Sequence, residues 1–252
     1  MMKRHFTALP LVVLASLLLL PALALGSAIP MTAQLVIVDA EQGGETGQFA
    51  ALFPVDTVIS GTYTYDLDAP VTIMSTQNNV QLGTLNTLGL AFNADPAVSL
   101  EFSVRAGAFG TNFTITSATI SFDPINDPIA YATAGVTVTD RNSNGATLTG
   151  LLPNGKAYQA IFNNQLPAWA TLITGPVVAP ATGSKSASDR SPPGAGNWAS
   201  VGYPVSMMSS QFKFNLTALD SASGTSNFEV IPEPATLGLI ALGCLGLLRR
   251  RR

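Results

Sequence analysis

Apolar and polar residues alternate through most of the middle of this chain, the pattern of β-strands that bury one face. Residues 98–105 alternate without a break, and Phe212, Phe214 and Leu216 alternate with polar neighbours in the same way. Because successive side chains of a strand point to opposite faces, each segment places one side in a core and the other in water. Further strands are predicted at residues 33–38, 58–65, 85–92, 113–122, 136–139, 147–151, 157–162 and 228–231.

Threonine, valine and phenylalanine dominate these segments, turn residues separate them, and no stretch of the body has a convincing helical period. In residues 113–122 the apolar parity shifts between Ile115 and Ile120, which predicts a bulge or a break. Residues 29–229 are numerous enough for one domain with a sizeable core. The sequence therefore predicts an all-β body, an antiparallel β-sandwich of jelly-roll-like type.

Two connections are predicted from turn residues. Residues 174–200 are rich in glycine, proline and serine and are expected to form a long surface loop, with a linker between subdomains as the alternative. Asn144 and Gly145 are typical of hairpin turns, which predicts a hairpin that joins residues 136–139 to residues 147–151.

The same turn is also a weak candidate for a metal site. Asp140, Asn142 and Asn144 place oxygen-bearing side chains at alternate positions before a glycine, as the first half of a calcium loop does. The position of the bidentate glutamate holds Leu151 instead. We therefore favour a plain turn and predict no bound metal and no cofactor.

The N-terminus has the layout of a secretory signal peptide. Lys3 and Arg4 precede an apolar run at residues 9–20, and small residues follow Pro21. We expect residues 1–28 to form a signal helix that engages the general secretion machinery and is cut after Gly26 or Ala28. A permanent N-terminal anchor is the alternative.

The C-terminus has a second export-related layout. Pro232, Glu233 and Pro234 precede an apolar stretch at residues 235–248, and the chain closes with Arg249, Arg250, Arg251 and Arg252. Fourteen helical residues reach about 21 Å, short of the roughly 30 Å of a bilayer core, but arginine stems lengthen the effective span. Four arginines also favour the cytoplasmic face and stop transfer. We predict a short transmembrane helix and transient anchoring in the inner membrane.

This tail resembles the PEP-CTERM sorting signal of exported bacterial proteins, including the Ala235, Thr236 and Leu237 that follow the prolines. The resemblance covers residues 230–252. It implies recognition by an exosortase, a membrane-embedded cysteine transpeptidase that cuts near Pro-Glu-Pro and passes the body to the cell surface or extracellular matrix. The alternative is a short hydrophobic tail that ends in arginines by coincidence.

Removal of both signals changes the chemistry that remains. The one histidine, His5, lies in the signal peptide, and the one cysteine, Cys244, lies in the C-terminal apolar stretch. The mature body then lacks the residues for Ser-His-Asp or Cys-His catalysis, for histidine or thiolate metal sites and for disulfides. Six basic residues remain against fifteen acidic ones, a balance of −9, which argues against nucleic acid as a partner.

Two groups of residues remain as candidates for body chemistry. Paired carboxylates are one catalytic apparatus still open to a body without histidine, and Asp66 with Asp68 and Asp123 with Asp127 form such pairs. Turn formation explains these aspartates better. Trp169 and Trp198 lie near predicted loops, where aromatic rings stack on sugars in many carbohydrate-binding modules, or fill a core.

The sequence thus predicts an exported, non-enzymatic protein of the cell surface or exopolysaccharide matrix, with exopolysaccharide as a candidate partner. A carbohydrate-binding module is the first alternative. A carboxylate-dependent glycosidase or lyase is the second.

Overall fold

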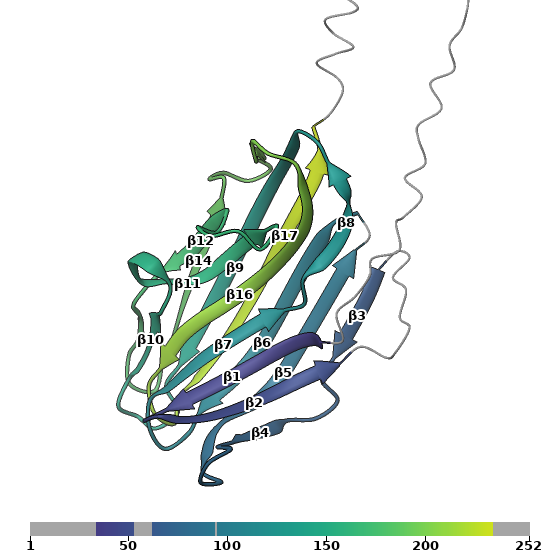
Figure 1. The fold of residues 1–252 in the computed structure, drawn as a ribbon. Coiled ribbons are helices and arrows are strands. Elements are labelled where there is room, and N and C mark those ends of the chain that lie inside the picture. Colours follow the sequence, from purple (N-terminus) through teal and green to yellow (C-terminus); the bar gives the residue numbers. More distant parts are fainter. Residues whose placement is uncertain (1–33, 53–61, 94, 234–252) are drawn as a thin grey trace, which may run out of the picture.

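The computed structural model describes residues 34–52, 62–93 and 95–233, which form two antiparallel sheets packed face to face (Figure 1). Within these residues, sheet I has nine strands. Its main path runs through β12 (Ala170–Thr174), β11 (Lys156–Phe162), β16 (Val205–Leu216), β7 (Thr111–Ser117), β1 (Gln34–Gln42) and β2 (Glu45–Leu52). Three further strands join it: β8 (Ile120–Ile125) and β10 (Ala146–Gly150) pair with β16, and β13 (Val177–Ala179) pairs with β10.

Sheet II has eight strands within the described residues. Its main path runs through β14 (Ser184–Ser191), β9 (Pro128–Thr139), β17 (Ser221–Pro232), β6 (Ala97–Ala106), β5 (Gln81–Asn93) and β3 (Thr62–Asp66). The short strands β15 (Ala199–Ser200) and β4 (Val71–Met74) pair with β9 and β5. The predicted all-β antiparallel sandwich is confirmed.

The two predicted terminal helices, at residues 1–28 and 235–248, lie outside the described residues. Within the described ranges the helical element is the short 3₁₀ turn η1 (Pro153–Gly155). No helix found there is long and apolar enough to cross a membrane.

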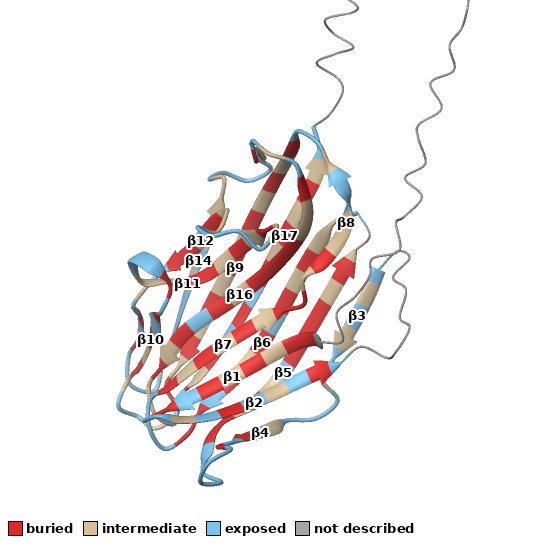
Figure 2. Cartoon of the chain, in the orientation of Figure 1, coloured by how far each residue is buried: buried red, intermediate tan, exposed pale blue. Residues whose placement is uncertain are grey.

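Alternation along the strands builds the core between the sheets (Figure 2). Every second residue of β6 and β9 is buried, and the residues between them face outward. At the centre, Phe102 of β6 meets Phe212 and Phe214 of β16, with ring centroids 4.9 and 5.7 Å apart. Gly224 of β17 leaves room for this contact, because a Cβ there would lie 2.5 Å from Cε1 of Phe102.

The predicted irregularity in residues 113–122 is confirmed as a break between β7 and β8. β7 ends at Ser117 and β8 begins at Ile120, and both strands pair with β16. The amide of Ala118 donates to the carbonyl of Leu35 at 2.7 Å, so the residues of the break stay bonded to β1. The interruption lets Ile115 and Ile120 both point into the core.

The long loop predicted at residues 174–200 is wrong. This segment contains β13, β14 and β15, and β14 pairs with β9 over eight residues. β14 lies at the edge of sheet II, where backbone pairing holds it and few of its side chains need to be apolar. Its serines, Lys185 and Arg190 therefore hid the strand from a search for alternating hydrophobicity.

The hairpin predicted around Asn144 and Gly145 is also wrong. β9 belongs to sheet II and β10 to sheet I, where β10 pairs with β13 and β16. The turn therefore crosses from one sheet to the other. A turn dipeptide indicates a reversal of the chain, but the pairing partners of the flanking strands depend on distant residues.

The end of β1 and the start of β17 lie at the same end of the sandwich. Gln42, at the end of β1, donates to Thr111, whose hydroxyl bonds to the carbonyl of Leu82. The amide of Gly107 also bonds to Leu82, and the amide of Ala106 bonds to Asp220, just before β17. β1 therefore ends where β17 begins, at the lower left of Figure 1.

Candidate functional site

The sorting motif begins inside the last strand of the sandwich. β17 is a central strand between β9 and β6, and its final residue, Pro232, pairs with Pro128 of β9. The amide of Glu233 donates to the carbonyl of Asp127 at 3.2 Å, while Glu233 itself is exposed. The folded body thus presents Pro232 and Glu233 at its surface. Pro234 and the four terminal arginines lie outside the described residues.

A second candidate site lies on the outer face of sheet II. The ring of Trp198 meets Tyr131 edge to face, with centroids 4.6 Å apart. The guanidinium carbon of Arg190 lies 4.9 Å from the centre of the Tyr131 ring, a cation–π contact. Nη2 of Arg190 donates to the carbonyl of Asn197 at 3.1 Å, which ties β14 to the segment that carries Trp198.

Hydrogen bonds across three strands hold Tyr131 in place. Ser99 of β6 donates to Oδ1 of Asn227 at 3.0 Å, and Nδ2 of Asn227 donates to the Tyr131 hydroxyl at 2.6 Å. Tyr131 in turn donates to Oε2 of Glu229 at 2.8 Å. Burial and this bond to a carboxylate raise the pKa of Tyr131 to about 12, so the hydroxyl stays protonated as the donor.

Trp169, the other tryptophan considered for sugar stacking, packs toward the core. Its ring stacks on Phe228 at 5.8 Å and is tilted against Phe162 at 5.7 Å. Trp198 instead contacts residues that face outward from sheet II. A sugar-stacking role is therefore better placed at Trp198.

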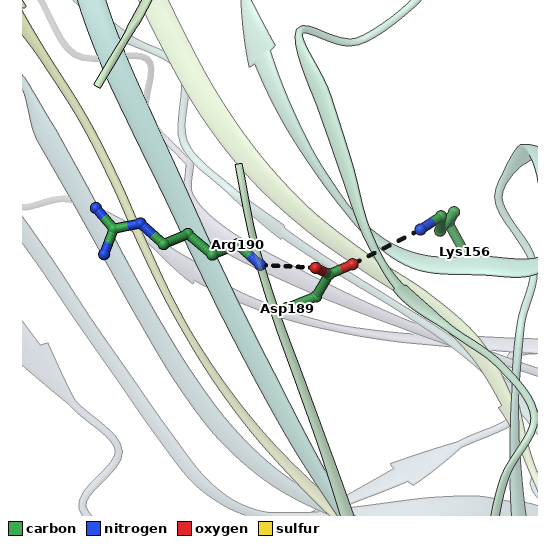
Figure 3. Close-up of polar contacts among 3 residues, drawn as sticks. All are labelled: Lys156, Asp189 and Arg190. Carbon is green, nitrogen blue, oxygen red and sulfur yellow. Dashed lines mark hydrogen bonds and ion pairs between the residues drawn. The ribbon is translucent and has the colours of Figure 1, made fainter. Parts of the chain in front are cut away.

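Asp189 and Arg190 are neighbours on β14, but their side chains point to opposite faces of sheet II (Figure 3). The Asp189 carboxylate accepts from the backbone amide of Arg190 at 2.8 Å and lies 3.7 Å from Nζ of Lys156 on β11. This ion pair joins the two sheets, and as a partly exposed pair it contributes at most about 1 kcal/mol. The Arg190 side chain points away from it, which leaves the guanidinium free for Tyr131.

The turn that carries the weak metal candidates is held by its own hydrogen bonds. Oδ1 of Asp140 accepts from the amides of Asn142 and Ser143, both at 3.1 Å, and Oδ2 accepts from the amide of Thr182 at 2.5 Å. The side-chain oxygen of Asn142 accepts from the amide of Asn144 at 3.4 Å. The side-chain oxygens that a calcium ion would need therefore accept backbone amides instead, and these bonds hold the turn that crosses between the sheets.

The buried carboxylate of Asp220 fixes the same crossing from the other side. It accepts from the amide of Arg141 at 3.1 Å and from the hydroxyl of Thr217 at 2.5 Å. Within the described residues, no group of three or more His, Cys, Asp or Glu side chains is placed to hold a metal ion.

We expect neither calcium nor a chelator to change the melting temperature, because the Asp140 oxygens already accept backbone amides. Calcium that bound the folded state would have to stabilise it. A rise of several degrees in millimolar calcium that is lost in Asp140→Ala would contradict this expectation. Thermal unfolding followed by circular dichroism gives the answer.

Asp140 should also make stability depend on pH. Burial alone would raise its pKa, but hydrogen bonds from the amides of Thr182 and Asn142, among others, lower it below the ordinary 3.8. A lowered pKa stabilises the fold fully above the unfolded value, and this contribution disappears as pH falls through the folded value. Asp140→Asn should therefore show a flatter loss of stability below about pH 4 than the parent protein.

The acidic pairs do not converge on one site. Asp66 ends β3 of sheet II, and Asp68 follows in the next turn, whereas Asp123 lies in β8 of sheet I and Asp127 in the turn before β9. All four residues are exposed. The pairs thus lie on different sheets.

The sequence contained one signal for the outer face of sheet II that hydrophobic periodicity did not use. Hydroxyl residues recur at every second position of β14 and β17, at Ser184, Ser186 and Ser188 and at Ser223 and Thr225. Period-2 hydroxyls indicate an outward strand face. Their assembly with Tyr131 and Arg190 depends on the strand order, which local sequence does not reveal.

Comparison with known proteins identifies the tail alone. Residues 230–252 match the PEP-CTERM protein-sorting motif. No curated protein matches the chain. The match confirms the resemblance drawn from the prolines, the apolar stretch and the arginines, and it implies an exported protein that follows a cell-surface route and is processed by an exosortase.

Comparison with solved structures does not assign the body, residues 29–229, to a family. The adhesin domain of Epf from Streptococcus pyogenes is 8% identical, over 81% of this chain and 63% of that chain, with a TM-score of 0.29. The VP2 subviral particle of infectious bursal disease virus is 13% identical, over 89% of this chain and 74% of that chain, with a TM-score of 0.13. The chain spans less than two thirds of the Epf chain, and TM-scores this low carry no argument.

Proposed function

We propose that this protein is a non-enzymatic component of the cell surface or exopolysaccharide matrix, delivered there by exosortase processing. The observation that carries the proposal is the PEP-CTERM motif at residues 230–252, which starts in the final central strand of a β-sandwich. A folded body that ends directly at the processing signal is suited to release as one intact unit.

The composition of the body supports a non-enzymatic role. Residues 29–248 contain no histidine, and their one cysteine is Cys244 in the C-terminal apolar stretch. The mature protein therefore lacks the histidine that activates a serine or cysteine nucleophile in catalytic triads and dyads. The acidic pairs are divided between the two sheets, so neither pair gains a partner from the other.

A carbohydrate-binding module is the second candidate function. The contact of Trp198, Tyr131 and Arg190 on the outer face of sheet II favours it. Aromatic rings with a polar rim are common in sites that bind sugars, because the rings stack on apolar sugar faces while polar groups bond to hydroxyls.

Fractionation of cells that make the full chain tests the proposed function. In cells with a working exosortase, we expect the protein in the matrix or surface fraction at reduced mass. In cells without the enzyme, it should stay in the membrane fraction at a higher mass. Equal amounts in the matrix with and without the enzyme would contradict the proposal, as would release of reducing sugars from polysaccharide by the purified protein.

A further inference from the structure

The outer face of sheet II is organised in rows that cross the strands. The row through the middle of the face contains Ser188, Gly135, Thr225, Glu101, Gly89 and Asp66, which the strand registers place side by side from β14 to β3. The row beside it, nearer the end of β17, contains Arg190, Thr133, Asn227 and Ser99. We name the middle row, together with the hollow over it, the glycine row.

The glycine row is a trough because Gly135 has no side chain, whereas at its other glycine, Gly89, the side chain of Glu101 fills that space. Three adjoining depressions of about 690, 270 and 260 Å³ follow it, and Thr225 lines all three. Gly135 lines the two larger ones. At strand spacings of about 4.8 Å, a row that crosses six strands is roughly 24 Å long. The trough is thus long enough for an extended polymer and too shallow to enclose a small molecule.

Hydrogen bonding distinguishes the hydroxyls of the middle row from those beyond it on this face. In the next two rows toward the start of β14, hydroxyls pair across the strands: Thr137 with Ser186, which both line the 270 Å³ depression, and Thr139 with Ser184, each at 2.8 Å. Among the described residues, the hydroxyls of Ser188 and Thr225 have no such partner. Polar groups that line a hollow and lack partners in the protein are available to a ligand.

The wall of the trough is built in advance. Arg190 is held by the Tyr131 ring and the Asn197 carbonyl, and Asn227 is held between Ser99 and Tyr131. Side chains that are already fixed lose little conformational entropy when a ligand binds. Trp198 packs on Tyr131 beside this wall and extends the face with an aromatic surface.

The charges of the lining favour a neutral ligand. Arg190 is the one cation among the described residues that line the three depressions, and the carboxylates of Glu101 and Asp66 oppose it, whereas the Asp189 carboxylate faces Lys156 on the other side of the sheet. The body as a whole carries an acidic balance. A polyanion would be repelled, whereas the hydroxyls of a neutral sugar can donate to carboxylates and bond to serine, threonine and asparagine.

We propose that the glycine row binds one chain of a neutral polysaccharide, laid across sheet II from β14 toward β3. The proposal names the partner of the surface or matrix protein described above and rests on that proposed function for the setting in which the two meet. The site itself rests on Gly135, Thr225 and the Arg190 wall.

Filling the trough tests the proposal. A Cβ at Gly135 would have its nearest neighbours at 3.8 Å, the Ala187 carbonyl and the Thr225 hydroxyl, so Gly135→Phe should fold and occupy the hollow. Thr139→Phe places the same ring on the same strand and face, outside the trough, and is the matched control. Thr225→Val removes the hydroxyl that all three depressions share.

Affinity electrophoresis in gels that contain dextran, galactomannan, mixed-linkage β-glucan or alginate supplies the measurement. The protein is purified from detergent extracts of whole cells that express the full chain, so the result does not depend on processing or location. We expect at least one neutral polysaccharide to retard the parent protein and Thr139→Phe equally. Gly135→Phe should weaken this binding at least about tenfold, with an unchanged melting temperature, and Thr225→Val should weaken it less.

Three results would overturn the proposal: no retardation by any neutral polysaccharide, stronger retardation by alginate, or unchanged binding by Gly135→Phe. A failure here leaves exosortase processing intact as a property of the tail. Failure of the fractionation experiment would instead leave polysaccharide binding by the purified protein unchanged, so the two claims are separable.

Discussion

Glu233→Ala is expected to leave the protein folded and exported but uncut, held in the membrane with its C-terminal segment attached. The bond from the residue 233 amide to Asp127 involves the backbone alone, so alanine preserves it, and the exposed carboxylate is what the substitution removes. The short apolar stretch would then act as the membrane anchor. Immunoblots of membrane, surface and medium fractions measure the outcome.

Asp68→Ala is the matched control, since it removes another exposed carboxylate in a turn far along the chain from the motif. It should mature like the parent protein. Replacing Pro232 and Pro234 with alanine should act like Glu233→Ala. If Glu233→Ala matures and leaves the membrane normally, the tail is only a weak anchor and the sorting function is wrong.

Deletion of residues 249–252 should have a different effect. Without arginines to stop transfer, a span of about 21 Å holds poorly in a bilayer core of roughly 30 Å. Uncut protein should therefore appear in the soluble fraction. Retention of this variant in the membrane would show that the arginines are not needed as a stop-transfer signal.

Phe212→Ala is expected to cause the largest loss of stability among single substitutions in the body. Phe212 is fully buried and contacts Phe102 of the opposite sheet and Tyr158 of β11, each at 4.9 Å between ring centroids. Truncation of a buried phenylalanine costs about 3–5 kcal/mol, which lowers the melting temperature of a domain of this size by roughly 10 °C.

Phe109→Ala provides the comparison for this prediction. Phe109 is 68% exposed, and its carbonyl, which accepts from Gln42, remains after the substitution. The melting temperature of the Phe109→Ala variant should stay close to that of the parent protein. Similar losses in the two variants, measured by thermal unfolding, would contradict the assignment of the core to the space between β6 and β16.

The central strands of the sandwich were predictable because each buries one face and exposes the other. Residues 98–105 of β6 and the alternating phenylalanines of β16 carry this pattern in full. The edge strand β14 was not predictable in this way, because it has few apolar side chains and is held by its backbone pairing with β9. Period-2 hydrophobicity reports burial, and an edge strand can pair without it.

The sorting motif and the sheet II face differ in how much local sequence reveals. Pro232, Glu233, the apolar stretch and the arginines are contiguous, so their order alone identified the signal. The glycine row takes its residues from six strands that lie far apart in the sequence. Trp198 was noticed alone, but its contacts with Tyr131 and Arg190 depend on a strand order that emerges only from folding.

The intact mass of the protein recovered from the cell surface tests the central claim most directly. We expect a single form that begins after Gly26 or Ala28 and ends near Pro232–Pro234, without residues 235–252. In cells that lack the exosortase, the surface form should disappear and the membrane form should retain the complete tail. A surface protein whose mass includes Arg249–Arg252, or the same surface mass in both kinds of cell, would contradict processing at the PEP-CTERM motif.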